Sequence, residues 1–386
     1  METTTKPQAQ LCAHCQKPAN LHCTRCKDTP ILADDIQPAV YCSSECQRAS
    51  WPTHKSICKR LKMRKMVYRA GDILQEMFYM FREHVFNKRV FKIEYKEGKM
   101  FIFDDQKPER FPDDEMMACH VPGPFPHSMC KADEDRKALR THMACSDAVA
   151  YLHEVVDHVF GGMPCVLTEL DIKPKNHKRE AVSVMRGVVD AIDHQHNIIK
   201  VKLRSNGEAF ILDLASAQYG YYEPITVWTD YMQNRVRCLV AREKKYDEWG
   251  GLLKDYRERE LSRDPKEVWL RMVLHLNGVI SQLLKHSILC WEEAVGTSIL
   301  KLLGLPKHQY EMQKKALLAE VDADLGHAIK WVEDQCEEDK KLRSAGLEGS
   351  MKWEGEGAGG VDGANEVDEV KIVLKEMGLT GSVFVV

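Results

Sequence analysis

The 386-residue sequence predicts an α+β protein in which helices dominate, organised as a small metal-held module followed by a larger body. Three observations lead to this prediction. Cysteines crowd into the first 58 residues, apolar residues recur at helical spacing over much of the remainder, and two pairs of short alternating segments flank turn residues as β-hairpins do. The length allows about two to three domains.

Charge and hydropathy argue against several classes of protein. Lys and Arg total 55 against 58 Asp and Glu, so the formal net charge of −3 provides no general basic field for nucleic acid. No apolar stretch approaches the roughly 18 residues of a membrane span, and the opening METTTKPQAQ lacks the features of a secretory leader. We therefore expect a protein of the nucleus or the cytoplasm with no membrane partner, and nucleic acid is not an expected partner.

Half of the 14 cysteines lie before residue 59, where they form close pairs that include one histidine. Such pairs are typical of structural zinc sites, and eight ligands fill two tetrahedral sites. A segment this short has too small a core to fold alone, whereas a structural zinc ion contributes about 10–16 kcal/mol of apparent binding energy. The predicted ligands of two Zn²⁺ ions are Cys12, Cys15, Cys23, Cys26, Cys42, Cys46, His54 and Cys58.

The order of these ligands, with the segments Y-C-S-S-E-C-Q and W-P-T-H-K-S-I-C, resembles a MYND-type zinc finger over residues 12–58. The resemblance implies a double-zinc cross-brace, in which alternate ligand pairs share an ion. The implied ligand sets are Cys12, Cys15, Cys42 and Cys46 for the first zinc, and Cys23, Cys26, His54 and Cys58 for the second.

The same resemblance implies a protein-binding module whose shallow groove takes proline-rich segments of the P-x-L-x-P kind. The positions that match the groove are Thr24, Gln47 and Trp51, and Thr24 stands where a serine is expected. Trp51 has an alternative interpretation as packing over the zinc-bound helices, because aromatic side chains commonly fill so small a core.

A basic helical connector is expected over residues 59–90. Within 71–87 the apolar residues recur at helical spacing, which predicts an amphipathic helix packed on a core. The basic residues near its start have three interpretations: a nuclear-entry signal, a stripe that contacts phosphates, or a solvated helix face. They are Lys55, Lys59, Arg60, Lys62, Arg64, Lys65 and Arg69.

Residues 91–240 are predicted to form an α+β domain. Two pairs of alternating segments predict short hairpins, the second turning at Ser205-Asn206-Gly207. The expected elements are, in order, a hairpin over 91–95 and 99–103, a loop over 106–127, a helix over 132–160, a strand over 165–170, and a hairpin over 196–203 and 209–214.

Four further segments complete the expected organisation. Residues 1–11 are a flexible N-terminus, and 241–332 form a helical region. Residues 333–370 are acidic and Gly-rich and bury too little apolar surface to offset chain entropy, so we expect a flexible segment. The apolar tail 371–386 either docks on the body or recruits a partner.

Familiar catalytic signatures are absent from the sequence, among them the phosphate-loop, serine-hydrolase, metalloprotease and dinucleotide motifs. The cofactor loop and catalytic segment of SET-domain lysine methyltransferases, some of which carry a MYND finger, are also missing. A methyltransferase is therefore not expected.

One constellation of reactive residues remains. Cys145 lies near the start of a helical stretch, His196 begins a predicted strand, and Asp213 lies on the strand paired with it. A cysteine near a helix N-terminus is favoured as a thiolate, an imidazole can take its proton, and a carboxylate can orient the ring. This order resembles the cores of papain-like and transglutaminase-like enzymes, which implies acyl transfer or peptide hydrolysis.

The same residues also have a structural interpretation. Cys145 can be a small buried apolar residue, His196 a polar residue at a strand edge and Asp213 a turn or cap group. In the catalytic interpretation, His194 competes with His196 for the role of the base.

Two functions follow. The first is a zinc-dependent adaptor for protein–protein interaction. The layout of the chain and the segment D-L-A-S-A-Q-Y-G resemble uncharacterised fungal MYND-type proteins. This resemblance implies a role in transcriptional or developmental regulation. The alternative is a cysteine hydrolase or acyltransferase that uses Cys145, His196 and Asp213, with the finger as its targeting module.

Overall fold

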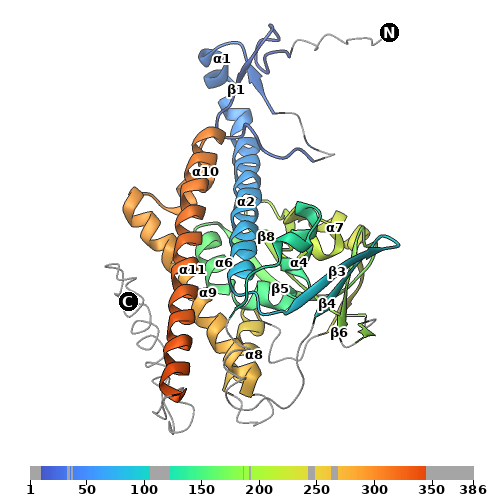
Figure 1. Ribbon diagram of the computed structural model, residues 1–386. Coiled ribbons are helices and arrows are strands. Elements are labelled where there is room, and N and C mark those ends of the chain that lie inside the picture. Colours follow the sequence, from blue (N-terminus) through green and yellow to red (C-terminus); the bar gives the residue numbers. More distant parts are fainter. Residues whose placement is uncertain are drawn as a thin grey trace, which may run out of the picture.

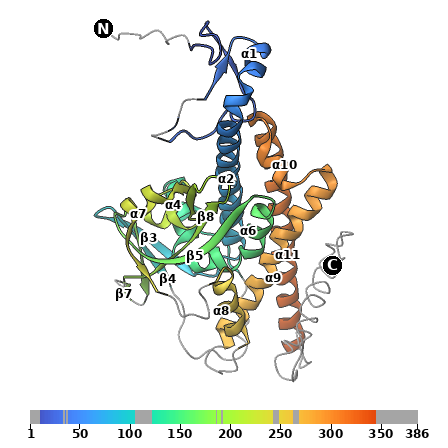
Figure 2. The same cartoon turned by 180° about the vertical axis from the view of Figure 1, so that it is seen from behind.

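A long helix, α2 (Trp51–His84), carries the zinc module at one end, and the body is built around the rest of it (Figures 1 and 2). The computed structural model describes residues 10–32, 35, 38–104, 122–185, 187–190, 193–241, 248–261 and 268–344. The expectations for residues 1–9 and for 345–386, which include the whole apolar tail, lie outside the described residues.

The finger places a two-stranded sheet and a short helix ahead of α2. Strands β1 (Leu21–His22) and β2 (Val40–Tyr41) pair antiparallel. Helix α1 (Ser44–Ala49) begins after the N-cap Ser43, whose hydroxyl accepts a hydrogen bond from the backbone N–H of Cys46. This cap fixes the start of the helix on which one predicted zinc ligand lies.

Helix α2 continues without interruption across the boundary expected at residue 58, and the helix predicted over 71–87 is its second half. Gly71 permits a close approach to strand β10 (Ile225–Val227), since a Cβ at this position would lie 2.4 Å from Ile225 Cγ1. Most of the fully buried side chains of α2 are apolar, among them Leu61, Val67, Ala70, Ile73, Leu74, Met77, Phe78 and Phe81.

Two further sheets form one side of the body (Figure 1). Their other strands are β3 (Val90–Lys96), β4 (Lys99–Asp104), β5 (Cys165–Pro174), β6 (Glu180–Met185), β7 (Val188–Val189), β8 (His196–Leu203), β9 (Ala209–Leu212) and β11 (Val236–Val240). One sheet is antiparallel with the order β10-β9-β8-β5-β11, and the other has the order β3-β4-β6-β7 with β4 and β6 parallel. Both predicted hairpins are present, as β3–β4 and β8–β9.

Helices α9, α10 and α11 lie on the side of α2 away from the sheets (Figures 1 and 2). In the described part of the chain, the helices that follow α2 are η1 (His127–Met129), α4 (Asp133–Thr141), α5 (Cys145–Ala150), α6 (His153–Phe160), η2 (Ser216–Tyr219), α7 (Trp228–Arg235), α8 (Gly251–Glu260), α9 (Val268–Val295), α10 (Ile299–Gly304) and α11 (Lys307–Ser344). Among the described residues, no helix combines the length and the apolarity that a membrane crossing requires.

Two expected segments differ from the structure. The helix predicted over 132–160 is divided into α4, α5 and α6, and Met143, at the first break, has a φ of +57° in the left-handed region, which a continuous helix does not allow. Helix α11 continues to Ser344, so the first part of the segment expected to be flexible from residue 333 is helical.

The basic residues of α2 do not form a continuous solvent-facing stripe. Arg64, Lys65 and Arg69 are buried. Lys65 Nζ donates to the carbonyl oxygen of Lys27 in the finger, 3.1 Å away, and Arg69 donates to that of Leu303 at the end of α10, 3.0 Å away. These three cations serve internal contacts and do not belong to a surface stripe. Lys55 and Lys59 are exposed, and the three interpretations of the basic segment stay predictions for them.

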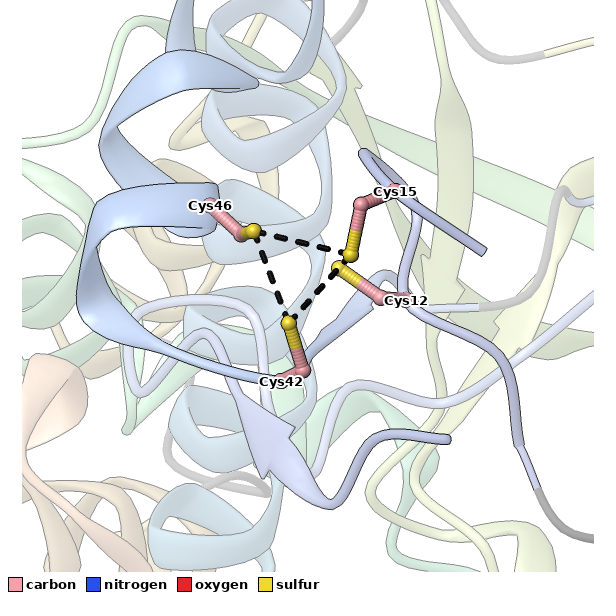
Figure 3. A group of neighbouring side chains, drawn as sticks. All are labelled: Cys12, Cys15, Cys42 and Cys46. Carbon is pink, nitrogen blue, oxygen red and sulfur yellow. Dashed lines mark hydrogen bonds between the residues drawn. The ribbon is translucent and has the colours of Figure 1, made fainter. Parts of the chain in front are cut away.

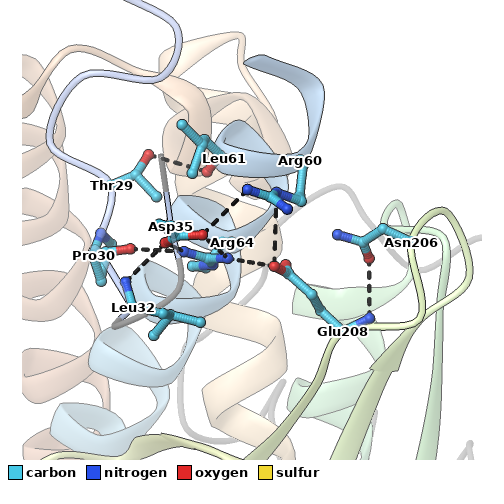
Figure 4. Close-up of polar contacts among 9 residues, drawn as sticks. All are labelled: Thr29, Pro30, Leu32, Asp35, Arg60, Leu61, Arg64, Asn206 and Glu208. Carbon is cyan, nitrogen blue, oxygen red and sulfur yellow. Dashed lines mark hydrogen bonds and ion pairs between the residues drawn. The ribbon is translucent and has the colours of Figure 1, made fainter. Parts of the chain in front are cut away.

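Arg64 joins the finger to the body (Figure 4). Its guanidinium pairs with Asp35 of the finger and with Glu208 in the turn between β8 and β9, and Arg60 contacts the same two carboxylates. The hydrogen bond from Arg64 holds the pKa of the Asp35 carboxyl below its usual value. We call Asp35, Arg64 and Glu208 the Arg64 clamp.

We predict that replacing Arg64 with Ala lowers the free energy of unfolding by about 3–5 kcal/mol, because two largely buried carboxylates lose their cation. Urea unfolding of the zinc-loaded protein at neutral pH measures the loss. Arg60→Ala is the matched control: its side chain is 36% exposed, and we expect less than about 1 kcal/mol. Equal losses in the two variants would contradict a clamp centred on Arg64.

Candidate metal centres and thiol site

Four cysteines converge within the finger as the first predicted ligand set (Figure 3): Cys12, Cys15, Cys42 and Cys46. The sulfur atoms of Cys15 and Cys42 are 3.4 Å apart, and those of Cys42 and Cys46 are 3.5 Å apart. A disulfide requires about 2.05 Å, whereas sulfurs bound at 2.3 Å to one tetrahedral zinc lie about 3.8 Å from one another. The thiols therefore occupy the corners of a cage close to the size that zinc requires.

The second set, Cys23, Cys26, His54 and Cys58, is buried. Cys26 Sγ lies 3.6 Å from His54 Nε2, and Cys23 Sγ lies 3.7 Å from Cys58 Sγ. A hydrogen bond between the thiols of Cys23 and Cys26 lowers the pKa of Cys23 to about 4 and raises the pKa of Cys26. Without a cation, the repulsion between thiolates keeps some of these cysteines protonated. Zn²⁺ supplies the positive charge that stabilises all of them as thiolate ligands.

The two sets alternate along the chain, as the cross-brace requires. Cys46 lies on α1, while His54 and Cys58 lie one turn apart on α2. Helix α2 then enters the core of the body. The second metal centre and that core are therefore joined by one uninterrupted helix. Two zinc ions fit these ligand sets.

The predicted peptide-binding residues lie on the finger beside these centres. Thr24 is exposed, and Gln47 and Trp51 are partly exposed. Trp51 packs against the small core of the finger, and the Arg25 guanidinium lies 5.8 Å from the centre of its ring. Trp51 therefore has the packing role of the alternative interpretation and still presents surface, while peptide binding by the three residues stays a prediction.

The structure brings Cys145, His196 and Asp213 together in the body. His196 begins β8, and Asp213 directly follows β9, the neighbouring strand. His196 Nε2 lies 2.9 Å from each oxygen of the Asp213 carboxylate. Cys145 begins α5, which packs against β8. The pairing of β8 with β9 and the packing of α5 on β8 bring these three residues, far apart in the sequence, into one region.

The charge of His196 is set by its neighbours. Burial opposes protonation of the ring, but the Asp213 carboxylate and the nearby Cys145 thiol raise the pKa of His196 to about 10. The ring therefore keeps its proton at neutral pH. Its Nδ1 atom is buried and has no partner of ordinary hydrogen-bond geometry in the described part of the chain, and Cys145 Sγ lies 3.5 Å from Asn197 Oδ1 instead.

His194, the alternative to His196, is directed elsewhere. Its Nε2 lies 2.8 Å from Asp190 Oδ2, and its side chain is 34% exposed. Sequence reasoning missed Tyr231, whose hydroxyl donates to Asp213 at 2.7 Å, and Tyr219, whose ring meets His196 edge-on at 5.0 Å. Tyr231 reaches Asp213 from α7, and nothing in the spacing of the sequence indicates this contact.

We predict that removing zinc unfolds the finger and also destabilises the body, because α2 loses its first turns and Arg64 loses Asp35. Chelation should reduce but not abolish the helical circular-dichroism signal and should lower the thermal midpoint of the body, and two equivalents of zinc should restore both. Cys238→Ser is the control, since this exposed thiol lies outside the finger and its loss should leave two zinc ions bound. If chelation left the thermal midpoint of the body unchanged, the predicted coupling between the finger and the body would be wrong.

Comparison with known proteins finds matches to short parts of the chain, one of which is the finger. The family model of the MYND finger matches residues 12–58. Methionine aminopeptidase 1A of Arabidopsis thaliana is 31% identical over 65 residues, and Dauer abnormal formation protein 25 of Caenorhabditis elegans is 41% identical over 59 residues. These matches cover 17% and 15% of this chain and only 16% and 12% of those two proteins. No solved structure matches the chain. Residues 12–58, with both ligand sets assembled, are therefore a MYND finger, a zinc-binding interaction module followed by an α+β body.

Proposed function

We propose that the protein is a zinc-dependent adaptor whose MYND finger binds a proline-rich or hydrophobic segment of a partner protein. The observation that carries the proposal is the finger itself, in which both zinc ligand sets are assembled next to partly exposed side chains. A role in transcriptional or developmental regulation, in the nucleus or the cytoplasm, is part of the proposal and rests on the resemblance to fungal MYND-type proteins.

The chemistry of the surface suits an extended peptide. Proline-rich segments already favour an extended helix without internal hydrogen bonds, so they lose little conformational entropy when they dock on aromatic side chains. Trp51 is held by packing on one side, so its exposed part is a rigid platform. The amide of Gln47, which lies on α1, can both donate to and accept from a peptide backbone.

The attachment of the finger adds a geometric consequence. Helix α2 and the Arg64 clamp fix the finger to the body, so a partner held at the finger would have a defined orientation relative to the two body sheets. An adaptor built this way presents two surfaces at a constant separation, rather than two modules on a flexible linker.

We expect Gln47→Ala combined with Trp51→Ala to weaken binding of a P-x-L-x-P peptide at least about 30-fold, the equivalent of roughly 2 kcal/mol for a tryptophan hot spot. Fluorescence polarisation of a labelled peptide measures the affinity, and metal analysis should still find two zinc ions per chain. Arg48→Ala is the control, because Arg48 lies on the same helix as Gln47 with its side chain 77% exposed. Unchanged affinity in the double variant would place the binding surface elsewhere.

A second candidate function, a cysteine hydrolase or acyltransferase, is favoured by the convergence of Cys145, His196 and Asp213. In this chemistry the thiol proton resides on His196, and the thiolate attacks the carbonyl carbon of an amide or ester. The leaving group takes the proton from the imidazolium, which leaves a thioester on Cys145. Water or an amine then attacks the thioester, gives up a proton to His196 and regenerates the thiol group.

The reactivity of Cys145 tests this candidate. If His196 stabilises a thiolate, iodoacetamide should modify Cys145 in the zinc-loaded protein at mildly acidic pH, and His196→Ala should slow the reaction at least about tenfold. Peptide mapping separates Cys145 from Cys238, an exposed thiol that serves as the internal reference. A rate that does not depend on His196 would identify the His196 and Asp213 contact as a structural ion pair.

A further inference from the structure

Two cations of the finger lie next to Trp51. The Arg25 guanidinium lies 5.8 Å from the centre of the Trp51 ring. Lys55 follows Trp51 by four residues on α2, so the two side chains project from the same face of the helix. Arg25 and Lys55 are both exposed, and Trp51 is partly exposed. A segment that docks on Trp51 therefore comes within reach of both positive charges.

The finger itself does not neutralise these two cations. Within the described ranges of the chain, neither Arg25 nor Lys55 takes part in an ion pair. The carboxylates of the finger in those ranges lie beside other cations: Glu45 pairs with Arg48, Asp35 belongs to the Arg64 clamp, and Asp28 lies near Lys65. Arg25 and Lys55 are therefore available to the carboxylates of a ligand.

The second metal centre fixes the positions of Arg25 and Trp51. Arg25 lies between the ligands Cys23 and Cys26, and the ring centre of Trp51 lies 6.1 Å from that of the ligand His54. Groups that are ordered before binding lose little conformational entropy when a ligand arrives. Three thiolates and one Zn²⁺ leave this centre with one net negative charge, but its ligands are buried, so an approaching segment meets the exposed cations first.

We propose that the partner segment bound at the finger carries acidic residues next to its proline-rich or hydrophobic core, and that Arg25 and Lys55 bind their carboxylates. The planar guanidinium of Arg25 can stack on the Trp51 ring and still present its N–H groups to a carboxylate. The apolar core of the segment supplies packing, while the charges supply orientation and faster association. The inference rests on the proposed peptide binding at the finger and specifies the charge of that peptide.

Fluorescence polarisation with the zinc-loaded full chain tests the inference. Three labelled peptides share one P-x-L-x-P core and carry Glu, Gln or Lys on both flanks. We expect the Glu-flanked peptide to bind at least about fivefold more tightly than the Gln-flanked peptide, because two exposed ion pairs each add a modest gain. The Lys-flanked peptide should bind most weakly. Sodium chloride at about 1 M, where the Debye length is about 3 Å, should remove these differences.

Arg25→Gln combined with Lys55→Gln should abolish the preference for Glu flanks over Gln flanks. Lys17→Gln combined with Arg48→Gln is the matched control, because it removes the same formal charge from exposed positions of the finger and should keep the preference. Metal analysis should find two zinc ions per chain in both variants. If the substitution of Arg25 displaces zinc, Lys55→Glu serves as the second variant, and the preference should then fall at least about threefold.

Equal binding of the Glu-flanked and Gln-flanked peptides by the unmodified protein would overturn the inference and leave peptide binding at the finger in place. A preference for Glu flanks that survives the loss of Arg25 and Lys55 would also overturn it. Tighter binding of a short single-stranded oligonucleotide than of the Glu-flanked peptide would assign the two cations to nucleic acid instead. If none of the three peptides binds, the proposed function fails and the inference fails with it.

Discussion

Helix α2 carries zinc ligands at one end and core residues along the rest, and this shared helix sets how the finger and the body are arranged. His54 and Cys58 lie on the first turns of a helix whose later turns pack their apolar side chains into the core of the body. A small finger has too little apolar surface to fold without metal. Here two of its metal ligands lie on the same helix as the apolar residues of the body's core. The finger therefore has a fixed position relative to the body.

Buried charge reinforces this arrangement at three places. Arg64 holds together two carboxylates from the finger and the β8–β9 turn, Arg69 donates to backbone carbonyls at the end of α10, and His196 pairs with Asp213. Each cation has partners that offset much of the cost of removing it from water. Arg235 differs, because its buried Nη1 atom lies near the Tyr221 ring and has no such partner among the described residues.

The proposed adaptor would present two surfaces in a fixed arrangement. The finger contributes a zinc-ordered surface that includes Trp51, and the body brings together a thiol, an imidazole and a carboxylate. The β8–β9 hairpin connects the two regions physically: Glu208 at its turn meets Arg64, and the opposite end carries His196 and Asp213. The same hairpin therefore contacts the finger at one end and carries residues of the thiol site at the other.

The zinc ligands and both hairpins were predictable from the sequence, because metal-ligand spacing and the twofold alternation of strands are local patterns. The sequence also placed Cys145, His196 and Asp213 on the elements that bring them together. It did not predict the continuity of α2, since the change from finger to body composition suggested a boundary that the backbone does not have. The burial of Arg64, the approach of Tyr231 to Asp213 and the position of Arg235 were decided only by tertiary structure, because each depends on contacts between segments whose separation along the chain carries no periodic signal.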